Sequence, residues 1–158
     1  MNGCSILKKI GIGVVGLGRI GKVHAEIFAS KIENAKLVAV MDIVEEVARS
    51  IGNTFKVKYY TNYDKLLTDS EIDAVVICTP TYLHKDMVIR AAENRKHILV
   101  EKPLTVTSKD AKECIDKVHK YGVKLQVGYM RRFDSVSYTH LRAHETEADI
   151  VCRLLLEK

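Results

Sequence analysis

The chain has 158 residues, which suits one domain with its own hydrophobic core and is short for a two-domain enzyme. Its formal net charge of +5 is spread along the sequence, without the clustered basic and aromatic stripes of nucleic-acid-binding proteins, so we expect no nucleic-acid partner. No apolar run reaches transmembrane length and the four cysteines include no C-x-x-C pair, which predicts no membrane partner, no metal site and a reduced, cytoplasmic protein.

The first predicted elements are a strand and a helix joined by a glycine-rich turn. An apolar run over residues 10–15 leads into three glycines with the spacing G-x-G-x-x-G, after which apolar residues recur at helical intervals. Such glycines allow a sharp turn, the approach of a pyrophosphate to backbone amides, and close packing of helix on strand. We therefore predict a dinucleotide site whose cofactor-binding residues at this turn are Gly16, Gly18, Arg19, Ile20 and Gly21.

Strands and helices alternate through the rest of the chain up to residue 134. Apolar runs and apolar/polar alternation predict further strands at residues 37–41, 57–60, 74–78, 98–100 and 123–127. Helical spacing predicts helices around residues 44–51, 63–67, 83–92 and 111–118, the first of them stopping near Gly52. This alternation predicts an α/β fold with a doubly wound parallel (Rossmann) sheet, formed as a single domain by residues 1–134.

Asp42 directly follows the second predicted strand, about 20 residues beyond the glycine turn. A carboxylate at this position can accept hydrogen bonds from the hydroxyls of an adenosine ribose, and its charge would repel a 2′-phosphate. The alternative is a solvated aspartate that caps the helix beginning near Val44. We favour the ribose role, which predicts NAD as the cofactor in preference to NADP.

Two further loops follow strands at the same predicted edge of the sheet. The fourth strand leads into Thr79-Pro80 and His84, and the fifth leads into Glu101-Lys102-Pro103. Ligands bind at the carboxyl ends of strands in open α/β sheets, and a lysine there can hydrogen-bond a substrate hydroxyl as that hydroxyl loses its proton. Each loop by itself is also typical of an ordinary turn.

Together these motifs resemble the amino-terminal half of the Gfo/Idh/MocA oxidoreductases. The resemblance rests on Gly16–Gly21, Asp42, Thr79-Pro80 with His84, Glu101-Lys102-Pro103, and Gly128-Tyr-Met-Arg-Arg-Phe-Asp134. The last stretch is most similar to the inositol 2-dehydrogenases of that family. The resemblance implies hydride transfer between a secondary alcohol of a cyclitol or sugar and NAD.

The resemblance also implies roles for individual residues. Lys102 would be the catalytic lysine and a substrate ligand, and Arg131 would lie at the substrate end of the pocket. Thr79, Pro80, Glu101 and His84 would neighbour the cofactor. The Lys102-Pro103 bond is a candidate cis peptide.

Some of these residues have a plainer interpretation. Arg131 can belong to a solvated basic pair at a strand end, and His84 can be simply a polar residue in the first turn of its helix. We predict that His24, on the apolar stripe of the first helix, is packed and hydrogen-bonded and takes no part in catalysis.

The resemblance ends after Asp134. Family members continue into a substrate domain with an Asp-x-x-x-His pair, whose histidine accepts the proton, and the chain contains no such pair. We interpret residues 135–158 as a tail foreign to the family, in which His140 and His144 do not form a zinc site, and we expect the fragment to be inactive alone. The face left by the missing domain should expose apolar side chains, and the full-length protein is expected to be a homo-oligomer.

Two other functions stay open at this point. One is a non-catalytic NAD-binding or regulatory module, which would have no need of a lysine at Lys102. The other is a methyltransferase with a similar glycine turn, which the Glu-Lys-Pro loop and the lack of an acidic residue ahead of Gly16 disfavour.

Overall fold

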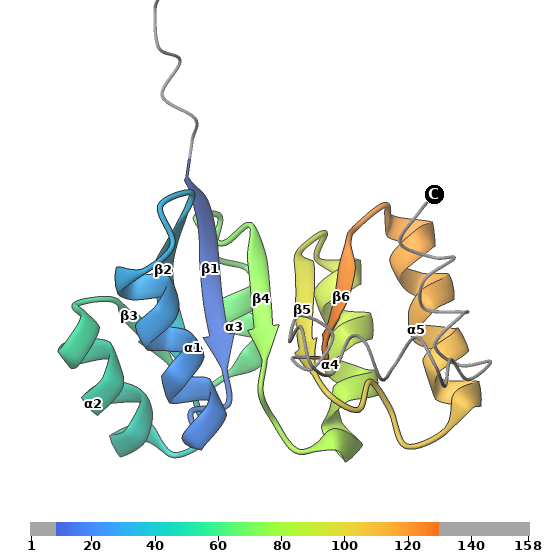
Figure 1. Ribbon diagram of the computed structural model, residues 1–158, viewed down its shortest axis with the longest axis horizontal. Coiled ribbons are helices and arrows are strands. Elements are labelled where there is room, and N and C mark those ends of the chain that lie inside the picture. The colour runs from blue at the N-terminus through green and yellow to red at the C-terminus, as the bar shows by residue number, and fades with distance from the viewer. Residues whose placement is uncertain (1–8, 130–158) are drawn as a thin grey trace, which may run out of the picture. The chain divides into compact units, whose positions relative to one another are not determined.

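Six parallel strands form one sheet in the order β3-β2-β1-β4-β5-β6, in a computed structural model that describes residues 9–129 (Figure 1). The elements in chain order are β1 (Ile10–Val15), α1 (Arg19–Ser30), β2 (Ala35–Met41), α2 (Glu45–Phe55), β3 (Lys58–Tyr60), α3 (Tyr63–Leu67), β4 (Ala74–Ile77), α4 (Thr81–Glu93), β5 (His97–Glu101), α5 (Ser108–Tyr121) and β6 (Leu125–Gly128). The predicted doubly wound parallel sheet is confirmed.

Helices cover both faces of the sheet, and each face has its own hydrophobic cluster. Ala25 of α1 and Ala48 of α2 pack on one face, where α1 and α2 lie in front of β1 and β2 in Figure 1. Leu66, Val88 and Cys114 bring α3, α4 and α5 onto the other face. Because the strands are covered on both sides, they read in the sequence as nearly continuous apolar runs.

The strand order reverses between β1 and β4. The chain runs from β1 outward to β2 and β3, then crosses back to β4 and continues outward to β5 and β6. In open α/β sheets, ligands bind outside the carboxyl ends of the strands at this reversal. The predicted glycine turn and both predicted loops follow carboxyl ends at this edge.

One predicted boundary is wrong. Helix α2 does not stop near Gly52 but continues to Phe55, and Lys56 closes it in the left-handed conformation with φ 55°. Gly52 instead gives space to β3, because an added Cβ would lie 3.0 Å from the Cβ of Tyr59.

The described residues up to Gly128 belong to one compact unit, and Tyr129 belongs to a second. The domain boundary predicted at residue 134 and the tail 135–158 lie outside the described residues, so both stay predictions.

Candidate functional site at the carboxyl edge of the sheet

The glycine turn is shaped by backbone contacts. Gly16 has φ 84°, a region that favours glycine, and its amide donates to Met41 O at 2.9 Å. A Cβ on Gly21 would lie 1.8 Å from Gly16 O, whereas a Cβ on Gly18 would meet nothing within 4 Å. Gly21 therefore permits the helix to pack on the turn, and Gly18 leaves open space beside it.

Helix α1 begins at this open space. Gly18 is its N-cap, no side chain forms a capping hydrogen bond there, and its first turn has no acidic residue. Amide groups at such a helix end carry partial positive charge and bind anions. Arg19 and Ile20 occupy the first two helical positions, beside the predicted phosphate position.

Asp42 is bound to the glycine turn and to the start of α2. One carboxylate oxygen accepts from Leu17 N at 2.8 Å and the other accepts from Val44 N at 3.0 Å. The bond to Val44 N lies ahead of α2, whose N-cap is Val44 and has no side-chain capping hydrogen bond, so the alternative role as a helix cap is not what the structure shows. The contact with Leu17 N is one that the sequence did not reveal. Each oxygen keeps a lone pair, so the carboxylate can also accept from ribose hydroxyls.

The loop after β4 packs directly against the glycine turn. An added Cβ on Gly16 would lie 3.0 Å from atoms of both Cys78 and Thr79. Burial, reinforced by the charge of Glu101, raises the pKa of the Cys78 thiol to about 12. Cys78 is therefore a neutral packing residue at neutral pH, while Thr79 and Pro80 border the site.

The loop after β5 presents Lys102. The Lys102-Pro103 bond is cis, as expected, and Lys102 is exposed. Among residues 9–129, no side chain forms an ion pair or hydrogen bond with its ammonium group. Its three N–H donors are therefore available to a ligand.

Glu101 is held by a residue from the other half of the sheet. His24 Nε2 of α1 lies 2.9 Å from Glu101 Oε1, and the two side chains are only 19% and 16% exposed. The His24 ring also stacks on Phe28. His24 is packed and hydrogen-bonded as predicted, but its partner makes it part of the site's framework. An i, i+4 pair of His24 with Phe28 was visible in the sequence, whereas the contact with Glu101 was not.

His84 is buried beneath both loops. Its side chain is 1% exposed, with Nδ1 2.9 Å from Pro103 O and Nε2 2.8 Å from Thr79 O. The residue neighbours the predicted cofactor loops, but its ring faces protein carbonyls.

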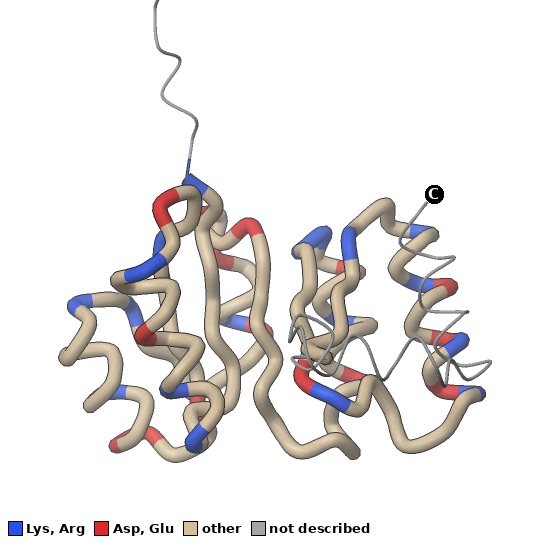
Figure 2. The backbone as a smooth tube through the Cα atoms, in the orientation of Figure 1, with Lys and Arg blue, Asp and Glu red and all other residues tan. Residues whose placement is uncertain are grey.

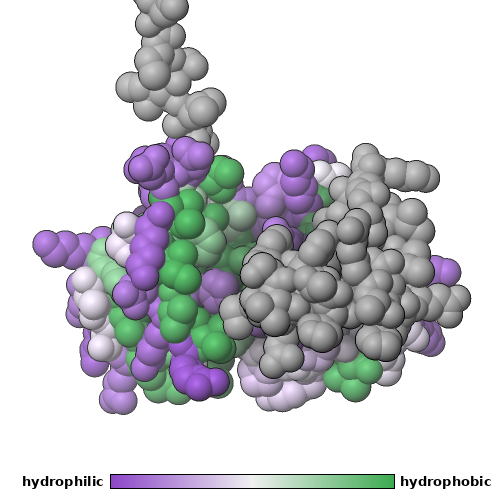
Figure 3. Space-filling view, in the orientation of Figure 1, coloured by the Kyte–Doolittle hydropathy of each residue, from purple (hydrophilic) through white to green (hydrophobic). Residues whose placement is uncertain are grey.

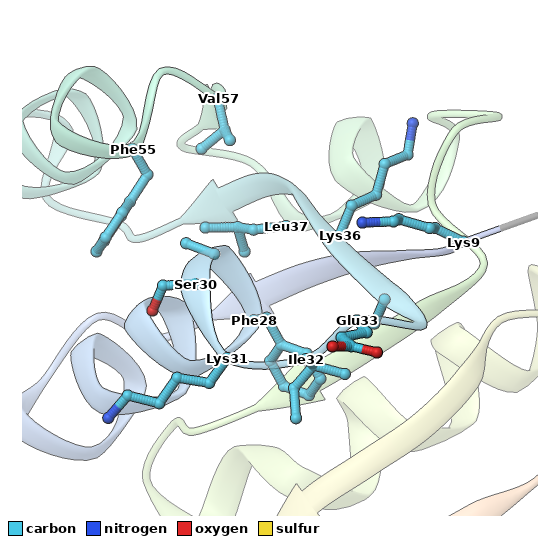
Figure 4. A pocket seen from close by; sticks show the side chains of 12 residues that line it. Lys9, Phe28, Ser30, Lys31, Ile32, Glu33, Lys36, Leu37, Phe55 and Val57 are labelled. Atoms are coloured by element: carbon cyan, nitrogen blue, oxygen red, sulfur yellow. The ribbon is translucent and has the colours of Figure 1, made fainter.

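Arg131, His140 and His144 lie outside the described residues. A hollow lined by Phe28, Leu37 and Val57, among others, lies at the opposite, amino-terminal edge of the sheet (Figure 4) and has no part in the site. Basic and acidic residues are mixed across the elements in Figure 2.

Residues 9–129 contain neither a membrane-spanning helix nor a group of metal ligands. None of the helices there has the length and apolar character needed to cross a membrane. In the same range, no three His, Cys, Asp or Glu side chains are grouped so as to hold a metal ion.

The chain matches a family model described as an oxidoreductase family with an NAD-binding Rossmann fold, over residues 10–129. It is 47% identical over 125 residues to the scyllo-inositol 2-dehydrogenase (NAD(+)) of Bacillus subtilis, covering 77% of this chain and 36% of that protein. It is 40% identical over 124 residues to the myo-inositol 2-dehydrogenase of Thermotoga maritima, covering 78% and 37%.

A solved structure of scyllo-inositol dehydrogenase from Lactobacillus casei with bound NAD(H) and scyllo-inositol superposes with a TM-score of 0.79 at 32% identity. The match covers 86% of this chain and 41% of that one. The chain thus spans less than half the length of each of these proteins.

Proposed function

The chain belongs to the Gfo/Idh/MocA family of oxidoreductases with an NAD-binding Rossmann fold, and on this premise we propose that it is the cofactor-binding part of an inositol-type dehydrogenase. The complete protein would move a hydride between NAD and a secondary alcohol of a cyclitol or sugar. The observation that carries this proposal is the convergence at one sheet edge of the glycine turn, Asp42 and Lys102, whose ammonium group is exposed and has no side-chain partner within residues 9–129. The names of the related dehydrogenases support the substrate class.

The residues at the edge fit a dinucleotide. The open space at Gly18 and the first amides of α1 would hold the pyrophosphate, and Asp42 would hold the adenosine ribose. The same negative charge disfavours a 2′-phosphate, which supports NAD over NADP. Thr79, Pro80 and Glu101 would line the rest of the cofactor site, and NAD supplies hydride acceptance when bound.

Lys102 would hold the substrate. Its exposed ammonium can donate a hydrogen bond to the oxygen of the reacting alcohol and stabilise negative charge that develops there. Arg131 would contact the substrate farther from the reacting carbon. By family resemblance, the proton-accepting histidine belongs to a second domain, so complete turnover needs the rest of the protein.

Calorimetric titration of the 158-residue chain tests the cofactor assignment. NAD should bind measurably and more tightly than NADP, and Asp42→Ala should lose at least about tenfold in NAD affinity, equivalent to about 1.4 kcal/mol. Glu45→Ala removes the same charge from the first turn of α2 and should leave the affinity unchanged. An Asp42→Ala chain with undiminished NAD affinity would refute the ribose role.

Lys102→Met in the complete protein tests the catalytic assignment. Turnover should fall by about a hundredfold or more while NAD affinity is retained, because Lys102 acts on the substrate. Lys109→Met, at another exposed lysine, is the control and should keep full turnover. Full activity of Lys102→Met would instead favour a binding or regulatory module, and substrate oxidation by the 158-residue chain alone would contradict the need for a second domain.

We also propose a cytoplasmic homo-oligomer for the complete protein. Free thiols at Cys78 and Cys114 support a reducing compartment. Tyr82, in the first turn of α4, is 75% exposed, and Val106, in the loop before α5, is 73% exposed. Large apolar side chains exposed at the edge of the site support a second domain or subunit that covers them. Light scattering should show a multimer of the complete protein, and a monodisperse monomer would contradict it.

A further inference from the structure

His84 is the one polar side chain fully buried among residues 9–129. It lies on α4, yet its ring contacts two loops that follow different strands: Thr79 O after β4, and Pro103 O after β5. A side chain that is buried and directed at two carbonyl oxygens of a site edge needs a stronger reason than packing, because an apolar residue would fill the space without any polar group to satisfy.

We propose that His84 is a positioning residue: it braces the Lys102-Pro103 loop against the Thr79-Pro80 loop and thereby sets where the Lys102 ammonium lies. The catalytic consequence of this brace rests on the function proposed above. The brace itself is a property of the 158-residue chain and can be tested without turnover.

The loop that carries Lys102 is held by few hydrogen bonds, although its Leu104 packs against the hydrophobic core. Within the described structure, Glu101 still pairs with Gly128 in the sheet, and Thr107 already caps α5 by accepting from Asp110 N. Between these two residues, the contact with His84 is the hydrogen bond that joins the loop to another element. Thr105 donates only to Thr107 O within the loop.

The other end of the brace is anchored at the glycine turn. Thr79 O lies 2.8 Å from His84 Nε2, and the Thr79 hydroxyl donates to Met87 Sδ of α4 at 3.3 Å. An added Cβ on Gly16 would lie 3.0 Å from Thr79 Cγ2, so the Thr79 loop packs on the turn. His84 therefore connects the predicted phosphate position with the lysine loop through one rigid side chain.

The chemistry of the ring fixes a condition on the proposal. A carbonyl oxygen only accepts hydrogen bonds, so the bond to Pro103 O needs an Nδ1–H group and the bond to Thr79 O needs an Nε2–H group. The brace therefore needs a ring that carries a proton on both nitrogens, because a neutral imidazole has only one N–H donor. A long-range ¹H–¹⁵N spectrum of the unmodified 158-residue chain shows directly whether each ring nitrogen carries a proton. An unprotonated Nδ1 or Nε2 would overturn the brace without any variant.

Two substitutions separate the two contacts. The amide nitrogen of Asn reaches the position of His Nδ1, and that of Gln reaches the position of Nε2. His84→Asn should keep the bond to Pro103 O, and His84→Gln should keep the bond to Thr79 O. In the 158-residue chain, the carbonyl ¹³C shift of Pro103 should move in His84→Gln and stay near its original value in His84→Asn, with the opposite pattern at Thr79.

The same pair distinguishes positioning from stability. In the complete protein, His84→Gln should lower kcat by about tenfold or more, since a small misplacement of a catalytic group has effects of this size. His84→Asn should stay within about threefold of the parent, also in KM. If His84→Gln and His84→Asn lose the same stability in urea and also the same factor in kcat, His84 has no positioning role.

The failure of either hypothesis is recognisable. If the complete protein has no dehydrogenase activity although the ¹³C pattern is as expected, the brace stands and the proposed function fails. If the complete protein has dehydrogenase activity but the carbonyl ¹³C shift of Pro103 does not change in His84→Gln, the function stands and the brace fails.

Discussion

The two halves of the site are built by different means. The glycine turn between β1 and α1 takes its shape mainly from the backbone, through a positive φ at Gly16 and a helix that packs within reach of Gly16 O because Gly21 has no side chain. The one distant side chain that bonds to it within residues 9–129 is Asp42, at Leu17 N. The lysine loop after β5 is set by side chains from distant parts of the chain, His24 and His84. The first half has no space for an added atom at Gly21, and the second depends on individual hydrogen bonds.

The largest expected effect comes from adding one methyl group to the turn. Gly21→Ala places a Cβ 1.8 Å from Gly16 O, and relieving this overlap should lower the free energy of unfolding by about 3 kcal/mol. Gly18→Ala, with open space around its Cβ, should lose about 1 kcal/mol or less and should weaken NAD binding instead. Urea titrations and calorimetry measure the two effects; an equally unstable Gly18→Ala chain would contradict the contrast.

An intermediate effect is expected where α1 contacts the lysine loop. His24→Phe preserves an aromatic ring beside Phe28 but removes the hydrogen bond to Glu101, which should destabilise the chain by about 1 kcal/mol. Adding Glu101→Gln in a double-mutant cycle should show coupling between the two sites in urea denaturation. If the losses of stability in the two single variants add up to the loss in the double variant, the contact between His24 and Glu101 contributes nothing to stability.

The smallest effect is expected on the far side of the lysine loop, at the start of α5. The Lys85 ammonium and the Thr107 hydroxyl hold the pKa of Asp110 below its ordinary value of 3.8. Asp110 therefore stabilises the fold above pH 4, and this contribution disappears as the pH falls through the lowered pKa.

The stability difference between the parent and Asp110→Asn should shrink between about pH 5 and the acid limit, in parallel urea titrations. Asp116→Asn, an exposed residue of the same helix, is the control. Because the Lys85 contact is at the surface, solvent screening should keep the effect at pH 7 small. A difference that grows as the pH falls would contradict the sign.

The two halves of the site differ in how far short stretches of sequence can predict them. Apolar runs identify the buried strands, and Gly16, Gly18 and Gly21 identify the turn, because periodicity and backbone freedom are properties of neighbouring residues. The prediction that α2 ends near Gly52 is wrong for the same reason, because a local rule takes no account of Tyr59 on the adjacent strand.

The sequence pattern also does not predict which apolar side chains of α1 are exposed. Hydrophobic side chains gather over α1 in Figure 3, and Val23 on that helix is 48% exposed. The apolar spacing of this helix predicts one buried stripe, but which of its residues reach the core depends on how the helix lies across the sheet. That angle follows from Gly21 and from the packing of Ala25 on the sheet face.

The sequence by itself determined the α/β alternation, the glycine turn, the candidate acid Asp42 and the candidate lysine Lys102, since each depends on residue types at short spacing. Only the tertiary structure decided what supports them. The strand order brings Glu101 to His24 across the reversal between β1 and β4, and brings Pro103 and Thr79 to the two nitrogens of His84. Hydrogen bonds between residues far apart in the chain leave no periodic trace, because they exist only once the sheet has placed its strands.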